Sequence, residues 1–251
     1  MKRGDFVAIM ILFVLIIFVV SCRKQKNIVI LTDEEIPIIT AAATVTSTAT
    51  VMTTHIDADD PNIQYYGRWD FSDAKNPRAD WAPSYVKTKF TGPFIGVRLQ
   101  DPNNNFWFRV NGGEYKMLTG TAAAEYGLAG GLGAGPHTVE FIRRSECGFG
   151  ITTFKGFLLD QGNSLIDPGP RPLRKMEFIG DSIGTGFGNE GNGGNTRWNE
   201  NAYMAFGSQL ARAFNAEENV MAKSGYGILR YGGETKPWGT PRMMDMYQSC
   251  L

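Results

Sequence analysis

The sequence predicts two regions of different fold class, an antiparallel β-sandwich followed by an α/β unit. Three observations predict them. Short apolar runs that alternate with polar residues fill positions 58–165, a proline-rich stretch covers 166–175, and a strand–helix–strand pattern lies within 176–251. We therefore expect a sandwich domain, a stiff linker and an α/β unit with these boundaries.

The overall composition is that of a globular protein with a balanced surface charge. The chain has 251 residues, of which 43% are hydrophobic, enough for one large domain or two modest ones. Its 25 basic and 25 acidic residues cancel and form no long run of one sign. Because a nucleic-acid-binding protein should show a basic surface, we expect no nucleic-acid partner.

The first residues have the pattern of a secretion signal. Lys2 and Arg3 precede an apolar run over 6–20, which is shorter than the about 20 residues of a membrane-spanning helix. VVSC at 19–22 resembles a bacterial lipobox, which implies removal of residues 1–21 and a lipid on Cys22 that anchors the protein to a membrane of the cell envelope. The alternatives are secretion and an uncleaved N-terminal anchor, and in each case the rest of the chain lies outside the cytoplasm.

Residues 22–57 are predicted to form a tether. The segment IITAAATVTSTATVMTT at 38–54 carries no charge and no helical period, which favours an extended linker. Its threonine and valine content leaves a β-strand as the alternative. Beyond this segment, Cys147 and Cys250 make no disulfide framework and have no zinc-site spacing, so we expect free thiols, no metal and no cofactor.

Alternation of side chains defines the predicted strands of the sandwich. In FIGVRLQ, Ile95, Val97 and Leu99 alternate with small or polar residues. Similar runs are FWFRV at 106–110, HTVEFIRR at 137–144 and FGITTFKGFLLD at 149–160, separated by turn-forming clusters at 101–105, 111–113 and 131–136. Short alternating strands with such turns are typical of an antiparallel sandwich.

Trp107 is out of phase with the apolar face of its own strand, which Phe106, Phe108 and Val110 form. A ring on that other face could stack on a sugar, so Trp107 is a candidate substrate-binding residue. Burial in the core is the alternative for Trp107. The same two interpretations apply to the other aromatic residues Tyr65, Tyr66, Trp69 and Trp81.

The pattern after the linker predicts two parallel strands joined by a helix. MEFIG at 176–180 is a short apolar strand, and NVMA at 219–222 is the next. Between them, residues 200–215 are expected to form a helix with one apolar face, composed of Tyr203, Phe206, Leu210 and Phe214. A strand–helix–strand connection makes its two strands parallel, and here we expect them to be adjacent.

Ser182 lies in a glycine-rich turn directly after the first of these strands, and three motifs fit that turn. GDSIG at 180–184 has the form of the α/β-hydrolase nucleophile elbow, which normally follows several strands of one sheet. GFGNEG at 186–191 has the form of the dinucleotide fingerprint, but GNGGN at 191–195 cannot open the helix which that motif needs. The third motif is one that resembles a known family of hydrolases.

FIGDSI at 178–183 resembles the first sequence block of the GDSL, or SGNH, hydrolases. Four further segments resemble carbohydrate esterase family 2, namely YYGRWDFSD at 65–73, YVKTKFTG at 85–92, HTVEFIRRSE at 137–146 and AKSGYGILR at 222–230. The resemblance implies a jelly-roll-like β-sandwich joined to a flavodoxin-like α/β/α SGNH domain. It also implies a serine esterase that removes acetyl groups from plant polysaccharides such as xylan.

The resemblance implies that Ser182 is the nucleophile. Since Ser182 and Gly225 follow adjacent parallel strands, their backbone N–H groups can both face a developing oxyanion. Glycine at 225 lets the backbone approach the acyl group closely. We expect Asp181 to cap the turn rather than to act as a catalytic acid.

The catalytic base is the part of the family pattern that these residues do not supply. The family requires an asparagine block and a late histidine, whereas His55 and His137 both precede Ser182. We expect His137 to be structural and the base to be encoded beyond residue 251, which would leave this chain incomplete and inactive. The alternative function is a carbohydrate-binding sandwich with a non-functional hydrolase remnant.

Overall fold

The computed structural model describes residues 38–39, 52–119, 122, 124–191, 197–233, 242–249 and 251, which belong to one compact unit. The predicted signal 1–21, Cys22, Cys250 and most of the predicted tether lie outside these residues. Within the described part of the chain, no helix is both long and apolar enough to cross a membrane.

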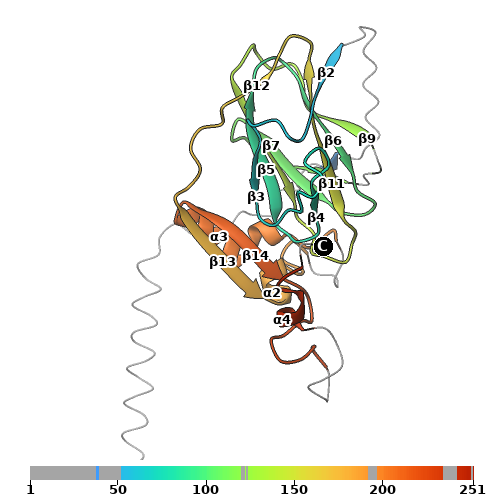
Figure 1. Cartoon of the computed structure of the whole chain (residues 1–251), viewed down its shortest axis with the longest axis vertical. Helices are drawn as coiled ribbons and strands as arrows, with labels where there is room; N and C mark the ends of the chain where they lie inside the picture. The colour runs from blue at the N-terminus through green and yellow to red at the C-terminus, as the bar shows by residue number, and fades with distance from the viewer. Residues whose placement is uncertain are drawn as a thin grey trace, which may run out of the picture. The chain divides into compact units, whose positions relative to one another are not determined.

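Two β-sheets make up the region from Thr53 to Ile166, called here the two-sheet region (Figure 1). The first is a seven-stranded sheet with the order β1-β8-β7-β10-β5-β12, in which β3 also pairs with β5. Its strands are β1 (Ile38–Ile39), β3 (Gln64–Tyr66), β5 (Ser84–Phe90), β7 (Phe106–Val110), β8 (Lys116–Leu118), β10 (His137–Arg143) and β12 (Leu165–Ile166). All of its pairings are antiparallel except that of β1 with β8.

The second is a five-stranded sheet with the order β2-β11-β6-β9, in which β4 also pairs with β11. Its strands are β2 (Thr53–Ile56), β4 (Arg78–Ala79), β6 (Ile95–Gln100), β9 (Ala124–Ala129) and β11 (Thr152–Asp160). The runs predicted as strands from their alternation correspond to β6, β7, β10 and β11. Their apolar residues supply much of the core.

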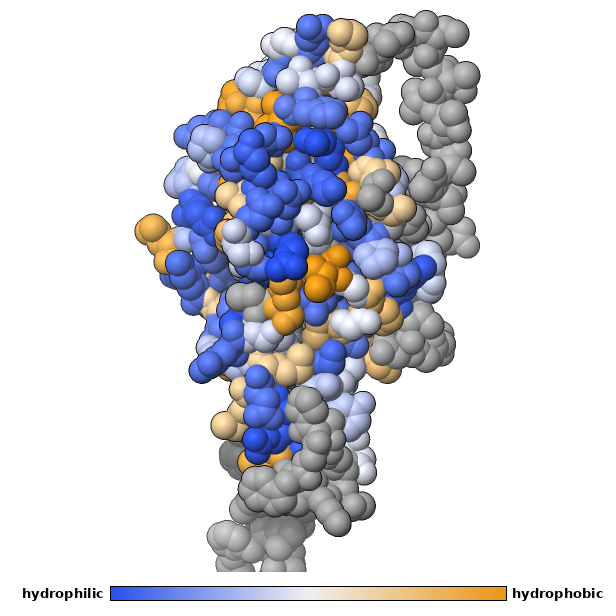
Figure 2. All heavy atoms as spheres, turned by 45° about the vertical axis from the view of Figure 1, so that its right-hand side comes forward, coloured by the Kyte–Doolittle hydropathy of each residue, from blue (hydrophilic) through white to orange (hydrophobic). Residues whose placement is uncertain are grey.

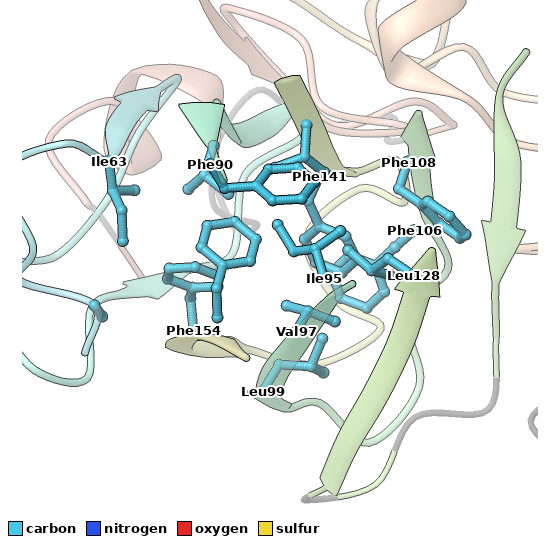
Figure 3. Close-up of a cluster of buried hydrophobic side chains, with 14 of the residues drawn as sticks. Ile63, Phe90, Ile95, Val97, Leu99, Phe106, Phe108, Leu128, Phe141 and Phe154 are labelled. Atoms are coloured by element: carbon cyan, nitrogen blue, oxygen red, sulfur yellow. The ribbon is translucent and has the colours of Figure 1, made fainter. Parts of the chain in front are cut away.

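The main hydrophobic core lies between the two sheets. Phe90 and Phe141 come from the first sheet and Ile95 and Phe154 from the second, and Figure 3 shows these side chains pointing toward one another. All buried members of this core lie between residues 58 and 165. Figure 2 shows one face of the molecule, on which hydrophilic residues predominate.

The predicted tether does not extend to residue 57. Residues 53–56 form β2, which pairs with β11 through His55 and Leu158, and residues 38–39 pair with β8. At both places the structure shows the alternative, a strand, because threonine and β-branched residues fit a pleated surface and the neighbouring strand offers backbone partners. The linker boundary also moves, since the next strand begins at Arg174.

The α/β region, from Arg174 to Ser249, contains the predicted pair of parallel strands. β13 (Arg174–Gly180) and β14 (Ala216–Ala222) pair in parallel, and Gly180 lies opposite Ala222. Between them are α2 (Ser182–Thr185), the 3₁₀ helix η1 (Ala202–Met204) and α3 (Phe206–Ala213), and α4 (Met243–Met246) follows β14. The prediction that the two strands are parallel and adjacent is confirmed.

The predicted helix over 200–215 is interrupted, and most of its apolar face is exposed. Ala205 has an extended backbone, with φ −67° and ψ 160°, which separates η1 from α3. Tyr203 is buried, but Phe206 is 58% exposed, and Leu210 and Phe214 are also exposed. The periodicity therefore located an apolar face of the helix without showing which face the strands cover.

Small residues make the buried face of α3 instead. Gly207, Ser208 and Ala211 are its buried positions. At Gly207 the helix approaches Phe178 of β13 so closely that a Cβ atom would lie 2.8 Å from the Phe178 ring. Glycine is required here by the close approach of helix and strand.

Replacing this glycine should therefore destabilise the α/β region. We expect Gly207→Val to lower the free energy of unfolding by about 1–3 kcal/mol, because the added side chain must displace Phe178 or the helix. Urea denaturation followed by circular dichroism measures the loss. Gly133→Val is the control, since a Cβ atom at Gly133 meets nothing within 4 Å. Equal stability of the two variants would contradict the predicted close packing.

Candidate active site

Ser182 is the first residue of α2 and follows β13 directly. Asp181 caps this short helix, and its Oδ1 accepts a hydrogen bond from the Ile183 N–H at 3.0 Å. The helix ends at Gly186, whose φ of 73° is in the left-handed region. The structure thus confirms the predicted capping role of Asp181 and leaves Ser182, half-buried, at the exposed start of the helix.

Gly225 lies three residues after the end of β14, in the turn 223–226, which is called here the oxyanion turn after the role expected for Gly225. Its φ of 83° is in the left-handed region, and a Cβ atom would lie 2.7 Å from the Tyr231 ring. Both facts require glycine. Its carbonyl oxygen accepts a hydrogen bond from the Gly232 N–H at 2.7 Å, which fixes the far side of the turn.

The turns that follow β13 and β14 lie against each other, as predicted. The hydroxyl oxygens of Thr185 and Ser224 are 3.5 Å apart, so α2 contacts the oxyanion turn. Among the hydrogen bonds of the described residues, the N–H groups of Ser182 and Gly225 do not act as donors. Within the described residues, neither N–H group is therefore occupied by a hydrogen bond of the fold itself.

His137 lies far from these turns and already has partners on both ring nitrogens. Asn111 Nδ2 donates to Nδ1, and Nε2 donates to the Gly133 carbonyl oxygen, each at 2.9 Å. His137 begins β10, whereas the opposite end of that strand, at Arg143, is followed by Arg144, which contacts the α/β region. At about 3.3 Å per residue the two ends are roughly 20 Å apart. The structural interpretation of His137 is confirmed.

His55 is also unsuited to act on Ser182. It lies on β2 in the second sheet, and its Nε2 is 3.2 Å from the Glu125 carboxylate. Within the described residues, no group of three His, Cys, Asp or Glu side chains is arranged to hold a metal ion.

Trp107 is on the opposite face of β7 from the core residues, as its phase predicted, but its ring is covered. Only 4% of it is exposed. The ring stacks on Tyr115 at 4.8 Å between centroids, and the Arg144 guanidinium lies 5.1 Å from its centroid. Tyr203 of the α/β region packs in the same cluster. In this position Trp107 contributes packing and has little surface to offer a sugar, so its predicted stacking role is not supported.

A buried polar junction joins the two regions beside the candidate site. It is formed by residues 143–147, called here the junction turn, at the end of β10. Arg144 donates to the Glu200 carbonyl oxygen at 2.9 Å and to the Glu190 carboxylate. The Glu146 carboxylate accepts a hydrogen bond from the Ser224 N–H at 2.6 Å. The junction turn therefore contacts the oxyanion turn directly.

Comparison with known proteins supports the sequence resemblance. Residues 65–169 match the model of the carbohydrate esterase 2 N-terminal family. The chain is 38% identical over 203 residues to cellulase/esterase CelE of Acetivibrio thermocellus, a match that covers 78% of this chain and 24% of that protein. The chain is related to the family 2 carbohydrate esterases.

Further family 2 relatives agree in sequence and in structure. An acetylxylan esterase / glucomannan deacetylase of Cellvibrio japonicus is 29% identical over 203 residues, covering 78% of this chain and 55% of that protein. The structure of a family two carbohydrate esterase from Clostridium thermocellum in complex with cellohexaose has a TM-score of 0.68 and 34% identity. That match covers 75% of this chain and 58% of the other. The chain thus spans less than two thirds of the length of these family members.

The sequence patterns did not identify two features of the structure, namely the pair Arg144 and Glu146 and the exposed Trp198. Arg144 and Glu146 lie in the run RRSE at the end of an apolar strand. Four consecutive polar residues at that place were a signal that the end of the strand packs against another part of the protein. Trp198 was not singled out either. It is 47% exposed, and the Arg197 guanidinium lies 4.9 Å from its ring centroid.

Glu200 is a buried carboxyl at the junction. Its Oε1 accepts a hydrogen bond from the Glu146 N–H at 2.5 Å, and its Oε2 has no hydrogen-bond partner among the described residues. Burial, together with the nearby Glu146 carboxylate, raises the pKa of Glu200 to about 8, although the hydrogen bond from the Glu146 N–H and the charges of Arg143 and Arg144 oppose the shift. Glu200 is therefore mainly protonated at neutral pH in the folded protein.

The contribution of Glu200 to the free energy of unfolding should consequently fall as the pH rises from about 4.5 to about 8. In that window the unfolded state releases the Glu200 proton while the folded state retains it, so each pH unit costs up to about 1.4 kcal/mol. Glu200→Gln still offers an acceptor to the Glu146 N–H but does not titrate. We expect this variant to gain stability relative to the unsubstituted protein between pH 5 and pH 8.

Urea midpoints of both proteins at the two pH values measure this gain. A difference between the two proteins that stays constant with pH would show that Glu200 does not titrate in this window.

Proposed function

We propose that the protein is an esterase that removes O-acetyl groups from a plant cell-wall polysaccharide, xylan or a related one, with Ser182 as nucleophile. Support for the substrate class comes from relatives named acetylxylan esterase / glucomannan deacetylase and from solved relatives in complex with cellohexaose. The alternative, a carbohydrate-binding protein with a non-functional hydrolase remnant, is not favoured because these relatives are named as esterases.

The proposal assigns the two-sheet region to a jelly-roll-like sandwich and β13, α2, α3 and β14 to the first part of a flavodoxin-like SGNH domain. The observation that carries the catalytic assignment is the parallel pairing of Gly180 with Ala222, which brings the turns of Ser182 and Gly225 to one sheet edge. Active groups of open α/β sheets collect at such carboxyl ends.

In the proposed reaction, Ser182 Oγ attacks the acetyl carbonyl carbon and loses its proton to a base. The carbonyl oxygen becomes an oxyanion that accepts hydrogen bonds from the N–H groups of Ser182 and Gly225. Loss of one such donor typically costs about 10²–10³-fold in rate. Collapse of the intermediate breaks the ester C–O bond, and the departing sugar oxygen takes the proton from the protonated base and leaves as a hydroxyl. Water then hydrolyses the acetyl-serine, which releases acetate and returns a proton to Ser182 Oγ. His55 and His137 do not serve as the base, since both are held elsewhere.

The 251-residue chain should therefore show background hydrolysis of p-nitrophenyl acetate, because a serine without a base stays protonated. A form of the protein that includes a catalytic base should hydrolyse this ester and release acetate from acetylated xylan. Ser182→Ala should reduce both activities by up to about 10⁶-fold. Ser72→Ala, at an exposed serine of the two-sheet region, is the control.

Two outcomes would contradict the assignment. Full activity in Ser182→Ala would exclude Ser182 as nucleophile. Acetylated-xylan binding without any release of acetate would favour the carbohydrate-binding alternative.

We also propose that Cys22 carries a lipid that holds the enzyme at the cell envelope, because VVSC follows a short apolar run with a basic start. Mass spectrometry of the mature N-terminus from the native host tests this. An intact Met1 or an unmodified Cys22 would overturn it.

A further inference from the structure

We propose that Glu146, a residue of the two-sheet region, positions the oxyanion turn and thereby sets the direction of the Gly225 N–H. This role rests on the proposed esterase function. In this role the two-sheet region helps to orient the reacting groups, in addition to packing against the α/β region.

Glu146 is held both by its side chain and by its backbone. Its carboxylate Oε2 accepts the Ser224 N–H at 2.6 Å, and its own backbone N–H donates to Glu200 Oε1 at 2.5 Å. The residue is only 5% exposed. A buried carboxylate that accepts a backbone N–H makes a charge-assisted hydrogen bond, which is about twice as strong as a neutral one.

The Glu146 carboxylate bonds to the oxyanion turn and forms no ion pair with the neighbouring arginines. Arg143 pairs with Asp80 and Arg144 pairs with Glu190, and Glu146 takes part in none of the salt bridges within the described residues. The Glu146 carboxylate is therefore left for the Ser224 N–H, although two guanidinium groups precede it closely in the chain.

The contact bears on catalysis because Ser224 immediately precedes Gly225. The turn is held on its near side by Glu146 and by Lys223, whose Nζ donates to the Cys147 carbonyl oxygen at 3.3 Å. It is held on its far side by the Gly232 N–H, which donates to the Gly225 carbonyl oxygen. With both sides fixed, the peptide that carries the Gly225 N–H has a set orientation. An oxyanion donor is effective when it is oriented before the reaction.

Amide NMR of the 251-residue chain tests the positioning directly and needs no catalytic activity. We expect Glu146→Ala to move the Ser224 and Gly225 amide signals and to speed exchange of the Ser224 amide by about 10–100-fold, while amides within β14 keep their protection. Glu146→Gln, which retains an acceptor of the same length without charge, should restore part of the protection. Glu140→Ala is the control, because Glu140 is a carboxylate on β10, the strand that precedes the junction turn, and its ion pairs are with Lys87 and Arg109.

The results separate a positioning role from a general structural one. Unchanged Ser224 and Gly225 signals in folded Glu146→Ala would overturn the proposal, as would equal changes in Glu140→Ala. If Glu146→Ala does not fold, the Glu146→Gln variant decides, and unchanged Ser224 exchange in that variant overturns the proposal.

A kinetic measurement links the turn to the reaction, in the form of the protein that hydrolyses acetyl esters. Glu146→Ala should lower kcat about 10-fold or more with KM changed less than twofold, and Glu146→Gln should recover part of kcat. An unchanged kcat in Glu146→Ala would overturn the catalytic link. Absence of esterase activity in the unsubstituted protein would instead refute the proposed function, and the NMR result would still show whether Glu146 sets the turn.

Discussion

Burial of charged side chains in the junction turn is the constraint on which the arrangement of the two regions depends. An ion removed from water costs several kcal/mol unless hydrogen bonds and opposite charges replace the lost solvation. Arg144 meets this requirement through the Glu200 carbonyl oxygen and the Glu190 carboxylate, and Glu146 meets it through the Ser224 N–H. These partners all come from the α/β region, so a shift of one region over the other would strand buried charges.

The same constraint explains why the polar contacts concentrate next to the candidate site. Asn105, from a turn of the two-sheet region, donates to the Arg197 carbonyl oxygen at 2.7 Å, and the Ala202 N–H donates to the Arg144 carbonyl oxygen at 3.0 Å. Backbone groups of the loops between α2 and α3 thus find partners on the two-sheet region. Loops fixed in this way can hold functional groups in place without regular structure of their own.

The second requirement of the candidate site is a glycine at each of two close contacts. Gly225 needs a left-handed backbone beside the Tyr231 ring, and Gly207 lets α3 contact Phe178. Together they allow the strands, the helix and the oxyanion turn to approach closely at the edge where Ser182 lies. A side chain at Gly207 would have to displace the Phe178 ring, and one at Gly225 would have to displace the Tyr231 ring.

Local patterns in the sequence determined much of the fold. Alternation located β6, β7, β10 and β11, and the strand–helix–strand order predicted the parallel pairing of β13 with β14. The glycine-rich turn after β13 predicted the place of Ser182, and Asp181 caps it as expected. These features depend on neighbours in the chain, on strand periodicity and on the handedness of connections, which a sequence carries directly.

Tertiary structure alone decided which surfaces meet. Trp107 is out of phase with its strand, but only the fold shows that Tyr115 and Arg144 cover it. Periodicity located the apolar face of α3 at Phe206 and Leu210, yet the strands pack on its small residues because close approach requires them. The pairing of Glu146 with Ser224 joins residues 78 positions apart. Contacts of this kind depend on how complete elements fit together, and no local pattern of residues specifies them.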